Sequence, residues 1–422
     1  MEIKSSKLNE SYEKIIHKSG LTLLLYPKKQ FKTAYAMITA GIGSIDNTFT
    51  IEGEDTITVP DGVAHFLEHK LFESEDGDSF EKYSKLGASA NAYTTFDRTA
   101  YYFSCTDNFK ESLKVLVEQV THPYFTQETV LKEQGIIGQE IRMYEDDPSW
   151  RVYFNLLGSL FNTHPIKKDI AGTKESIAQI TDKTLYDCHK AFYNLNNMVL
   201  TVAGNFEISD VIDVCDEMLS PKMALKVTKM PVAEDEQIVK PFAFESFPVS
   251  APLFQLGFKG INKGFPENFF NSAIGEIICE CIAGEGSSLY RELYDLSLIN
   301  TEFDSEVMAG PSYMVTMFAG ESKNPKLVAQ KIKNEVERLK NEGIDRDSFV
   351  RAKKCCYGRY VDTFTSCEGT AFNLAQCHFA CEEPYSVLER LAGITLNEAQ
   401  SFLRENFDEN RCALSIVAKD EF

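Results

Sequence analysis

His65-Phe66-Leu67-Glu68-His69 spells H-x-x-E-H, the reverse of the H-E-x-x-H pattern of zinc peptidases. A helix turns about 100° per residue, so His65 and His69 share one face and Glu68 lies beside them. Two imidazoles four residues apart can bind one Zn²⁺, and a neighbouring carboxylate can hold a metal-bound water. Three matching positions also arise by chance, so the significance of this motif depends on its flanks.

The flanking residues favour a helix around this motif. Asp61 follows a proline and is a typical N-cap residue for a helix that begins there. Val63, Leu67 and Leu71 recur at helical spacing and are suited to burial on the opposite face. The sequence therefore predicts a helix with polar chemistry on one face and core packing on the other.

A third metal ligand is expected further along the chain, because a catalytic zinc has three protein ligands and leaves one position for water. Residues 129–144 show helical periodicity and carry Glu133 and Glu140, which share a face since they are seven residues apart. A solvated acidic face is the alternative interpretation of these two glutamates. Gly135 and Gly138 each destabilise a helix by up to about 1 kcal/mol relative to alanine. One hypothesis is that they let this helix approach the first helix closely.

The H-x-x-E-H motif followed by E-x6-E resembles the pitrilysin/insulinase family of zinc metallopeptidases, the inverzincins. The resemblance implies one Zn²⁺ per chain, with His65, His69 and Glu140 as metal ligands. It also implies catalytic roles for Glu68, as the general base, and for Glu133, which supports the site.

Residues 87–94 resemble the family's edge strand, along which an extended peptide substrate is bound. An exposed strand edge recognises peptide backbone and therefore reads shape more than sequence. The resemblance implies substrate binding by seven successive residues, Ala88, Ser89, Ala90, Asn91, Ala92, Tyr93 and Thr94.

Length and composition narrow the class of protein. A chain of 422 residues is too long for one compact core and suggests two or more domains. The net charge of −20 argues against nucleic acid as a partner, because phosphate binding needs clustered Lys and Arg. No apolar stretch reaches about 18 residues and the N-terminus lacks a signal-peptide core, so we expect no membrane partner. Eleven scattered cysteines indicate free thiols, and we expect a cytoplasmic bacterial protein.

The chain is predicted to be a diverged repeat, because residues 196–204 are echoed by residues 410–418. Together with the resemblance, this predicts an α+β fold of two homologous α/β sandwich domains. Each domain would be an antiparallel-rich sheet with helices on one face, and the duplicated inverzincin fold would form half of a clamshell chamber. The predicted parts are a catalytic zinc-binding domain, a linker and a second domain without metal, at residues 1–222, 223–241 and 242–422.

The second half lacks the metal-binding residue types. The counterpart of the first helix, around residues 271–282, holds Glu276 and Glu280 but no histidine. The counterpart of Glu140 falls near Arg359, and a cation there opposes metal binding. We therefore expect the single zinc site in the first half.

A partner subunit is implied by a second difference from the family. Many relatives carry an Arg and a Tyr, seven residues apart, that contact the substrate near the zinc. The matching positions here are Tyr294 and Thr301. The resemblance therefore implies a heterodimer with a related subunit that lacks the zinc motif and supplies this pair, with a homodimer as the alternative.

The resulting hypothesis is a zinc-dependent metalloendopeptidase that hydrolyses short unfolded peptides, or processes one, through a zinc-activated water and Glu68. Two other interpretations stay open. One is a non-catalytic structural or assembly subunit, and the other is a maturation peptidase for one peptide encoded nearby. All three ligand positions and the base are present, which favours an enzyme.

Overall fold

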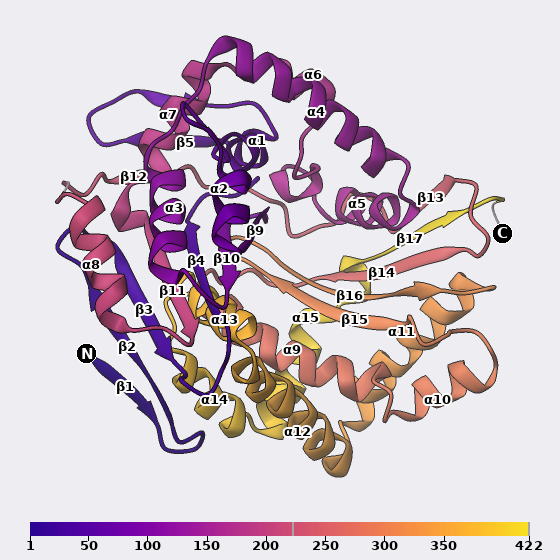
Figure 1. Ribbon diagram of the computed structural model, residues 1–422. Coiled ribbons are helices and arrows are strands. Elements are labelled where there is room, and N and C mark those ends of the chain that lie inside the picture. The colour runs from indigo at the N-terminus through magenta and orange to yellow at the C-terminus, as the bar shows by residue number, and fades with distance from the viewer. Residues whose placement is uncertain (222, 421–422) are drawn as a thin grey trace. The chain divides into compact units, whose positions relative to one another are not determined.

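The structure, a computed structural model, describes residues 1–221 and 223–420, which form two compact units (Figure 1). Unit 1 comprises Met1–Ile141, Asp169–Met230 and Asp362–Tyr385. Unit 2 comprises the segments Arg142–Lys168, Pro231–Val361 and Ser386–Phe422. These units differ from the predicted continuous domains because each half of the chain contributes one segment to the other unit.

Unit 1 is built on a seven-stranded sheet in the order β1-β2-β3-β11-β4-β10-β9. The pair β3–β11 is parallel and the other pairs are antiparallel. The edge strand β9 pairs with β10, so Thr94 lies opposite Thr99. The strands, in sheet order, are β1 (Glu2–Ser5), β2 (Glu10–Ile16), β3 (Thr22–Pro27), β11 (Met198–Gly204), β4 (Ala34–Ala40), β10 (Thr99–Cys105) and β9 (Ser89–Thr94).

Helices cover both faces of this sheet. The side chain of Thr94 contacts Glu68 of α1, whereas the ring of Tyr93 lies 5.9 Å from that of Phe372 in α13. Neighbouring strand residues point to opposite faces, so α1 and α13 lie on opposite sides, where helices on one face were expected. The helices are α1 (Val63–Lys70), α2 (Ser79–Leu86), α3 (Phe109–Thr121), α4 (Gln127–Glu145), α6 (Lys174–Ile177), α7 (Asp182–Phe192), α8 (Ile208–Met218) and α13 (Cys367–Phe379).

A small second sheet in unit 1 has the order β12-β5-β6. Its strands are β5 (Thr48–Ile51), β6 (Thr56–Thr58) and β12 (Val227–Lys229). The segment predicted as a linker, residues 223–241, therefore contains a strand that is paired antiparallel with β5.

Unit 2 repeats the central topology of unit 1, with the strand order β13-β17-β14-β16-β15. Its strands are β13 (Phe242–Ser246), β14 (Leu253–Lys259), β15 (Asp304–Ala309), β16 (Met314–Glu321) and β17 (Cys412–Ala418). Its helices are α5 (Pro148–Leu160), α9 (Glu267–Ala283), α10 (Ser288–Asp295), α11 (Pro325–Glu342), α12 (Arg346–Asp362), α14 (Pro384–Gly393) and α15 (Leu396–Asn406). The echoed segments form the equivalent strands β11 and β17, which confirms the predicted α+β duplication.

The two halves exchange equivalent helices. The helix α5 packs on β14 and β17 of unit 2, and α13 packs on β4 and β11 of unit 1. The fit is close at Gly257, where a Cβ would lie 2.8 Å from Cδ2 of Leu156. Each sheet thus buries its second face under a helix from the other half, which is why the compact units are not continuous in sequence.

The cysteines agree with the expectation of thiols without disulfide bonds. All eleven cysteines are free, and nine of them are buried. Within the described residues, no helix combines the length and hydropathy that crossing a bilayer requires.

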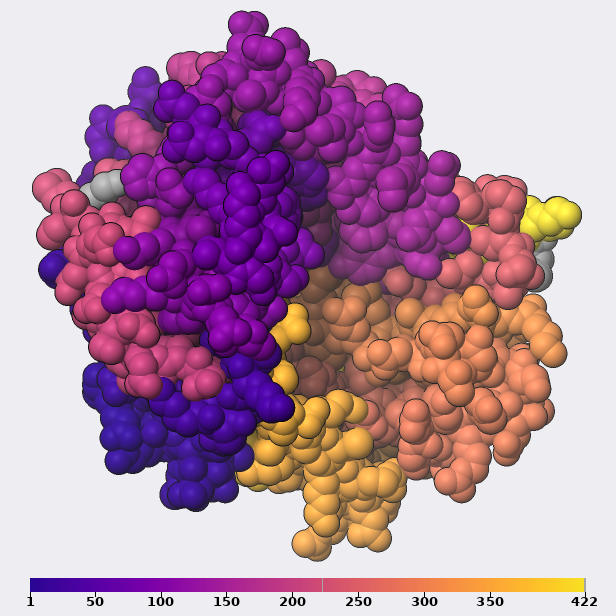
Figure 2. Space-filling model, viewed as in Figure 1, coloured from indigo at the N-terminus to yellow at the C-terminus, as the bar shows by residue number. Residues whose placement is uncertain are grey.

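The glycines of α4 do not serve close helix packing. A Cβ built at Gly135 or Gly138 meets no described atom within 4 Å, so the close-approach hypothesis is wrong. The helix lies at the surface, along the upper edge of the view in Figure 2, and Gly135 is exposed there.

Gly135→Ala is therefore expected to stabilise the protein by roughly 0.5–1 kcal/mol, because alanine loses less backbone entropy in a helix. Thermal unfolding would show this as a raised Tm. Gly87→Ala is the matched control, since it also has open space but a φ of 74°, and its Tm should fall. An unchanged or lower Tm for Gly135→Ala would contradict the explanation.

Candidate metal centre

The helix that carries the H-x-x-E-H motif begins later than expected. Its N-cap is Gly62, at φ 90°, and no side chain caps the helix, so the prediction of Asp61 as N-cap is wrong. The left-handed conformation favours glycine. Space also demands it, because a Cβ at Gly62 would lie 2.4 Å from the carbonyl oxygen of Ala171.

The two faces of α1 divide as the sequence predicts. Val63, Leu67 and Leu71 are each exposed by 2% or less. On the other face, the rings of His65 and His69 lie 4.6 Å apart between centroids. The helix therefore presents both imidazoles from a backbone that is anchored in the core.

The third group comes from α4. Glu140 Oε1 lies 3.6 Å from His65 Nε2, and Glu140 Oε2 lies 3.4 Å from His69 Nε2. These separations exceed ordinary hydrogen bonds but match the ligand-to-ligand distance of about 3.3 Å around a tetrahedral zinc. Within the described residues, one group of three or more His, Cys, Asp or Glu side chains has all its ligand atoms within 4.8 Å of one another. It consists of His65, His69 and Glu140. The donor set therefore fits Zn²⁺ with one position left for water.

Glu133 lies behind this group and contacts one of its imidazoles. Its Oε1 is 3.0 Å from His69 Nδ1, and its side chain is 8% exposed. An ionised carboxylate only accepts, so Nδ1 carries the proton and Nε2 faces the metal position. Within the described residues, the buried Nδ1 of His65 has no such partner.

The charges around His69 favour a cation. Burial by itself lowers the pKa of this imidazole. Hydrogen bonds to Glu133 and Glu140 outweigh burial and raise the pKa to about 10. Negative charge thus converges on the position that a metal ion would occupy.

Glu68 lies on α1 and its side chain contacts the edge strand β9. It is half-buried, and its Oε2 accepts a hydrogen bond of 2.6 Å from Thr94 Oγ1. The predicted substrate residues Ser89 to Thr94 form β9, and Ala88 directly precedes it. The candidate base is therefore in contact with the strand that is predicted to bind substrate, a contact that the sequence analysis did not identify.

The equivalent position of unit 2 holds an ion pair. Glu276 and Glu280 lie on α9, and Arg359 of α12 forms an ion pair with Glu280. By the repeat, Arg359 falls near the counterpart of Glu140. The guanidinium thus pairs with an acid of unit 2, whereas unit 1 has its candidate metal ligands.

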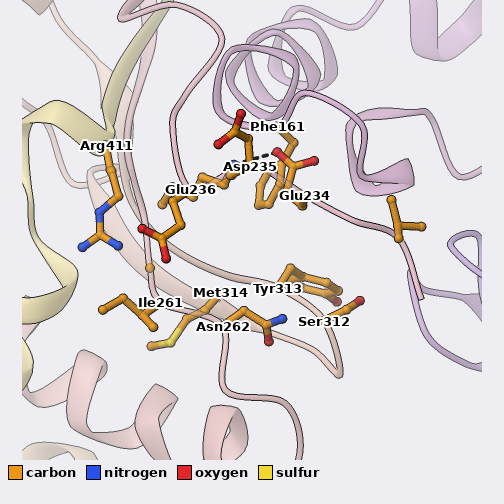
Figure 3. A pocket seen from close by; sticks show the side chains of 13 residues that line it. Phe161, Glu234, Asp235, Glu236, Ile261, Asn262, Ser312, Tyr313, Met314 and Arg411 are labelled. Atoms are coloured by element: carbon orange, nitrogen blue, oxygen red, sulfur yellow. Dashed lines mark hydrogen bonds and ion pairs between the residues drawn. The ribbon is translucent and has the colours of Figure 1, made fainter.

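A cavity of about 270 Å³ in unit 2 is a weaker candidate site (Figure 3). Lys259 beside it is buried and paired with Glu234 at 2.7 Å. His164 Nδ1 accepts from the backbone N–H of Ile166, so Nε2 donates to Ser312 Oγ at 2.9 Å. A histidine that donates to the serine cannot act as its base. These polar groups are therefore satisfied structural contacts.

Comparison with known proteins identifies the family of this chain. Residues 55–174 match the family Insulinase (Peptidase family M16), and residues 179–355 match the Peptidase M16 inactive domain. The chain belongs to peptidase family M16. The resemblance inferred from the motifs is thus confirmed, and the M16 inactive-domain match includes the positions of Glu276 and Glu280.

Two relatives of this M16 chain match it along nearly their whole length, and a third matches about half of it. It is 35% identical to the Bacillus subtilis "Uncharacterized zinc protease YmfH", over 98% of this chain and 99% of that protein. It superposes with a TM-score of 0.93 on the "Crystal structure of putative M16-like peptidase from Alicyclobacillus acidocaldarius", at 32% identity, covering 96% and 97% of the two chains. It is also 28% identical, over 46% of this chain and 36% of that protein, to the Arabidopsis thaliana "Probable mitochondrial-processing peptidase subunit beta".

Proposed function

We propose that this chain is a zinc-dependent metalloendopeptidase with one zinc per chain. The main support is that His65, His69 and Glu140 lie as far apart as the ligands of one zinc ion do, with Glu68 next to them. Membership of family M16 and a relative named as a zinc protease support this proposal.

Each residue of the site has a role in the proposed mechanism. A zinc ion held by His65, His69 and Glu140 would supply Lewis-acid polarisation and an acidified water. Glu68 takes the proton of the attacking water and returns it to the leaving amine. Glu133 holds His69 with Nε2 towards the metal position.

The substrate in this proposal is a short unfolded peptide. The strand β9 lies at the sheet edge, where an extended peptide can add as a further strand. Backbone pairing over Ala88 to Thr94 would favour extended peptides over folded proteins. The proposal includes the prediction that the two domains of this chain form half of a clamshell chamber.

The partner in this proposal is a related subunit without the zinc motif, with a homodimer as the alternative. The family pattern has Arg and Tyr at two positions where this chain has Tyr294 and Thr301. Tyr294 is exposed on α10, and Thr301 is exposed after that helix. The relative named as a beta subunit supports a multi-subunit arrangement. The eleven free cysteines support the proposed location in a bacterial cytoplasm.

The test is cleavage of a quenched peptide library by the zinc-loaded chain, alone and with a co-expressed related subunit. Cleavage that a chelator abolishes and added zinc restores would support the proposal. Cleavage by the chain alone would favour the homodimer, and cleavage only by the mixture would favour the heterodimer. Bound zinc without cleavage in either preparation would contradict the peptidase and favour a structural subunit.

A further inference from the structure

The last residue of β9 contacts the candidate base directly. Thr94 Oγ1 lies 2.6 Å from Glu68 Oε2. This length is typical of a hydroxyl that donates to an ionised carboxylate, which is among the stronger hydrogen bonds in proteins. The contact therefore restricts the position of the Glu68 carboxylate.

The direction of this hydrogen bond follows from its neighbours. Thr99 Oγ1 donates to the carbonyl oxygen of Ile42 at 2.9 Å, and Thr99 is fully buried. The hydroxyl proton of Thr99 is thus used, and its oxygen is 3.4 Å from Thr94 Oγ1. Thr94 has one hydroxyl proton, and the much shorter contact shows that it goes to Glu68.

The hydroxyl has no substitute on this face of the strand. The residues that point the same way as Thr94 are Ala90 and Ala92, because side chains alternate along β9. Within the described residues, Thr94 is the hydrogen-bond partner that the structure shows for the Glu68 carboxylate. A half-buried glutamate has several rotamers, so losing this contact would allow its carboxylate to move.

We propose that Thr94 is a positioning residue, whose hydroxyl holds one oxygen of Glu68 and leaves the other directed at the reacting water. This inference rests on the proposed peptidase function. It gives β9 a second role beside backbone pairing, since the strand that binds the peptide also orients the base. The same strand would therefore position both the peptide and the base. This matters because a displacement of about 1 Å can lower a rate about 10²-fold.

The test compares two substitutions at this position. Thr94→Val keeps the shape and removes the hydroxyl, and we expect kcat to fall about 10- to 100-fold. KM and zinc stoichiometry should stay unchanged, because β9 pairs through its backbone. Thr94→Ser keeps the hydroxyl and should restore most of kcat. Thr106→Val, at an exposed threonine after β10, is the matched control.

Three kinetic results would overturn the inference. They are a wild-type kcat in Thr94→Val, a loss in Thr94→Ser as large as in Thr94→Val, and a raised KM at constant kcat. The last result would indicate substrate docking instead of base positioning.

A second readout does not depend on activity. In crystal structures of the zinc-loaded proteins, we expect one position of the Glu68 carboxylate in wild type and Thr94→Ser and a displaced carboxylate in Thr94→Val. An unmoved carboxylate in Thr94→Val would refute the inference even if the wild type cleaved no peptide. Absence of cleavage by the wild type would count against the proposed function alone.

Discussion

Replacing Glu68 by glutamine is expected to lower kcat for peptide cleavage by about 10²- to 10⁴-fold, the usual contribution of a general base. Glutamine keeps the size of the side chain and can still accept the hydrogen bond from Thr94, but it cannot take a proton from water. Zinc binding should persist, because Glu68 is not among the three metal ligands.

The measurement is steady-state cleavage of one identified peptide, together with the zinc content of the same samples. Glu75→Gln, at an exposed glutamate a few residues beyond α1, is the matched control and should behave as wild type. A Glu68→Gln protein that retained about a tenth or more of the wild-type kcat would exclude Glu68 as the base.

Replacing Glu140 by alanine is expected to weaken zinc binding more than about 100-fold and to abolish cleavage at micromolar zinc. Loss of a partner behind a ligand typically lowers metal affinity 10- to 100-fold, and loss of a ligand should exceed this. Glu133→Ala should therefore fall between wild type and Glu140→Ala. Competition with a coloured chelator measures all three affinities.

Glu128→Ala is the control for this series, since Glu128 is an exposed glutamate on the first turn of the same helix. The order wild type, Glu133→Ala, Glu140→Ala would support the assigned roles. If Glu140→Ala bound zinc as tightly as wild type, α4 would not supply the third ligand.

Much of the site could be predicted because it depends on local periodicity. The spacing of His65 and His69 places both on one helical face, whatever the rest of the fold does. The glutamates of α4 were ambiguous by themselves, since a solvated acidic face has the same pattern. The family resemblance pointed to Glu140, and the structure brings it to both histidines.

Contacts between distant segments were not predictable from sequence patterns. The Thr94–Glu68 hydrogen bond depends on how α1 docks against the end of β9. The start of α1 is another case, because Asp61 has the local signature of an N-cap. The approach of Ala171, far away in sequence, leaves room only for glycine at position 62.

A buried lysine next to the proposed metal ligands also carries no sequence signal. Lys70 is fully buried and paired with Glu73, whose other oxygen lies 3.2 Å from Nζ of Lys132 on α4. This arrangement connects the end of α1 to the helix that carries Glu133. Lys70 and Glu73 are three residues apart, but Lys132 lies far along the chain, so the sequence does not show that the three side chains meet.

The exchange of α5 and α13 shows the same limit at the level of whole helices. Both helices have apolar residues suited to a sheet face, but their sequences do not show which sheet they cover. Tertiary packing determines this, as in the close contact between Leu156 and Gly257. Domain boundaries that are inferred from a repeat therefore describe the duplication and not the packing.

The central claim is that His65, His69 and Glu140 hold one hydrolytic zinc. The most direct measurement is a zinc titration of the metal-free protein, in the subunit composition that cleaves peptides, with cleavage followed at each addition. We predict that activity rises linearly and saturates at one zinc per chain, and that Glu68→Gln binds the same single zinc without activity. Cleavage that is independent of zinc, or activity that does not saturate at one zinc per chain, would contradict the claim.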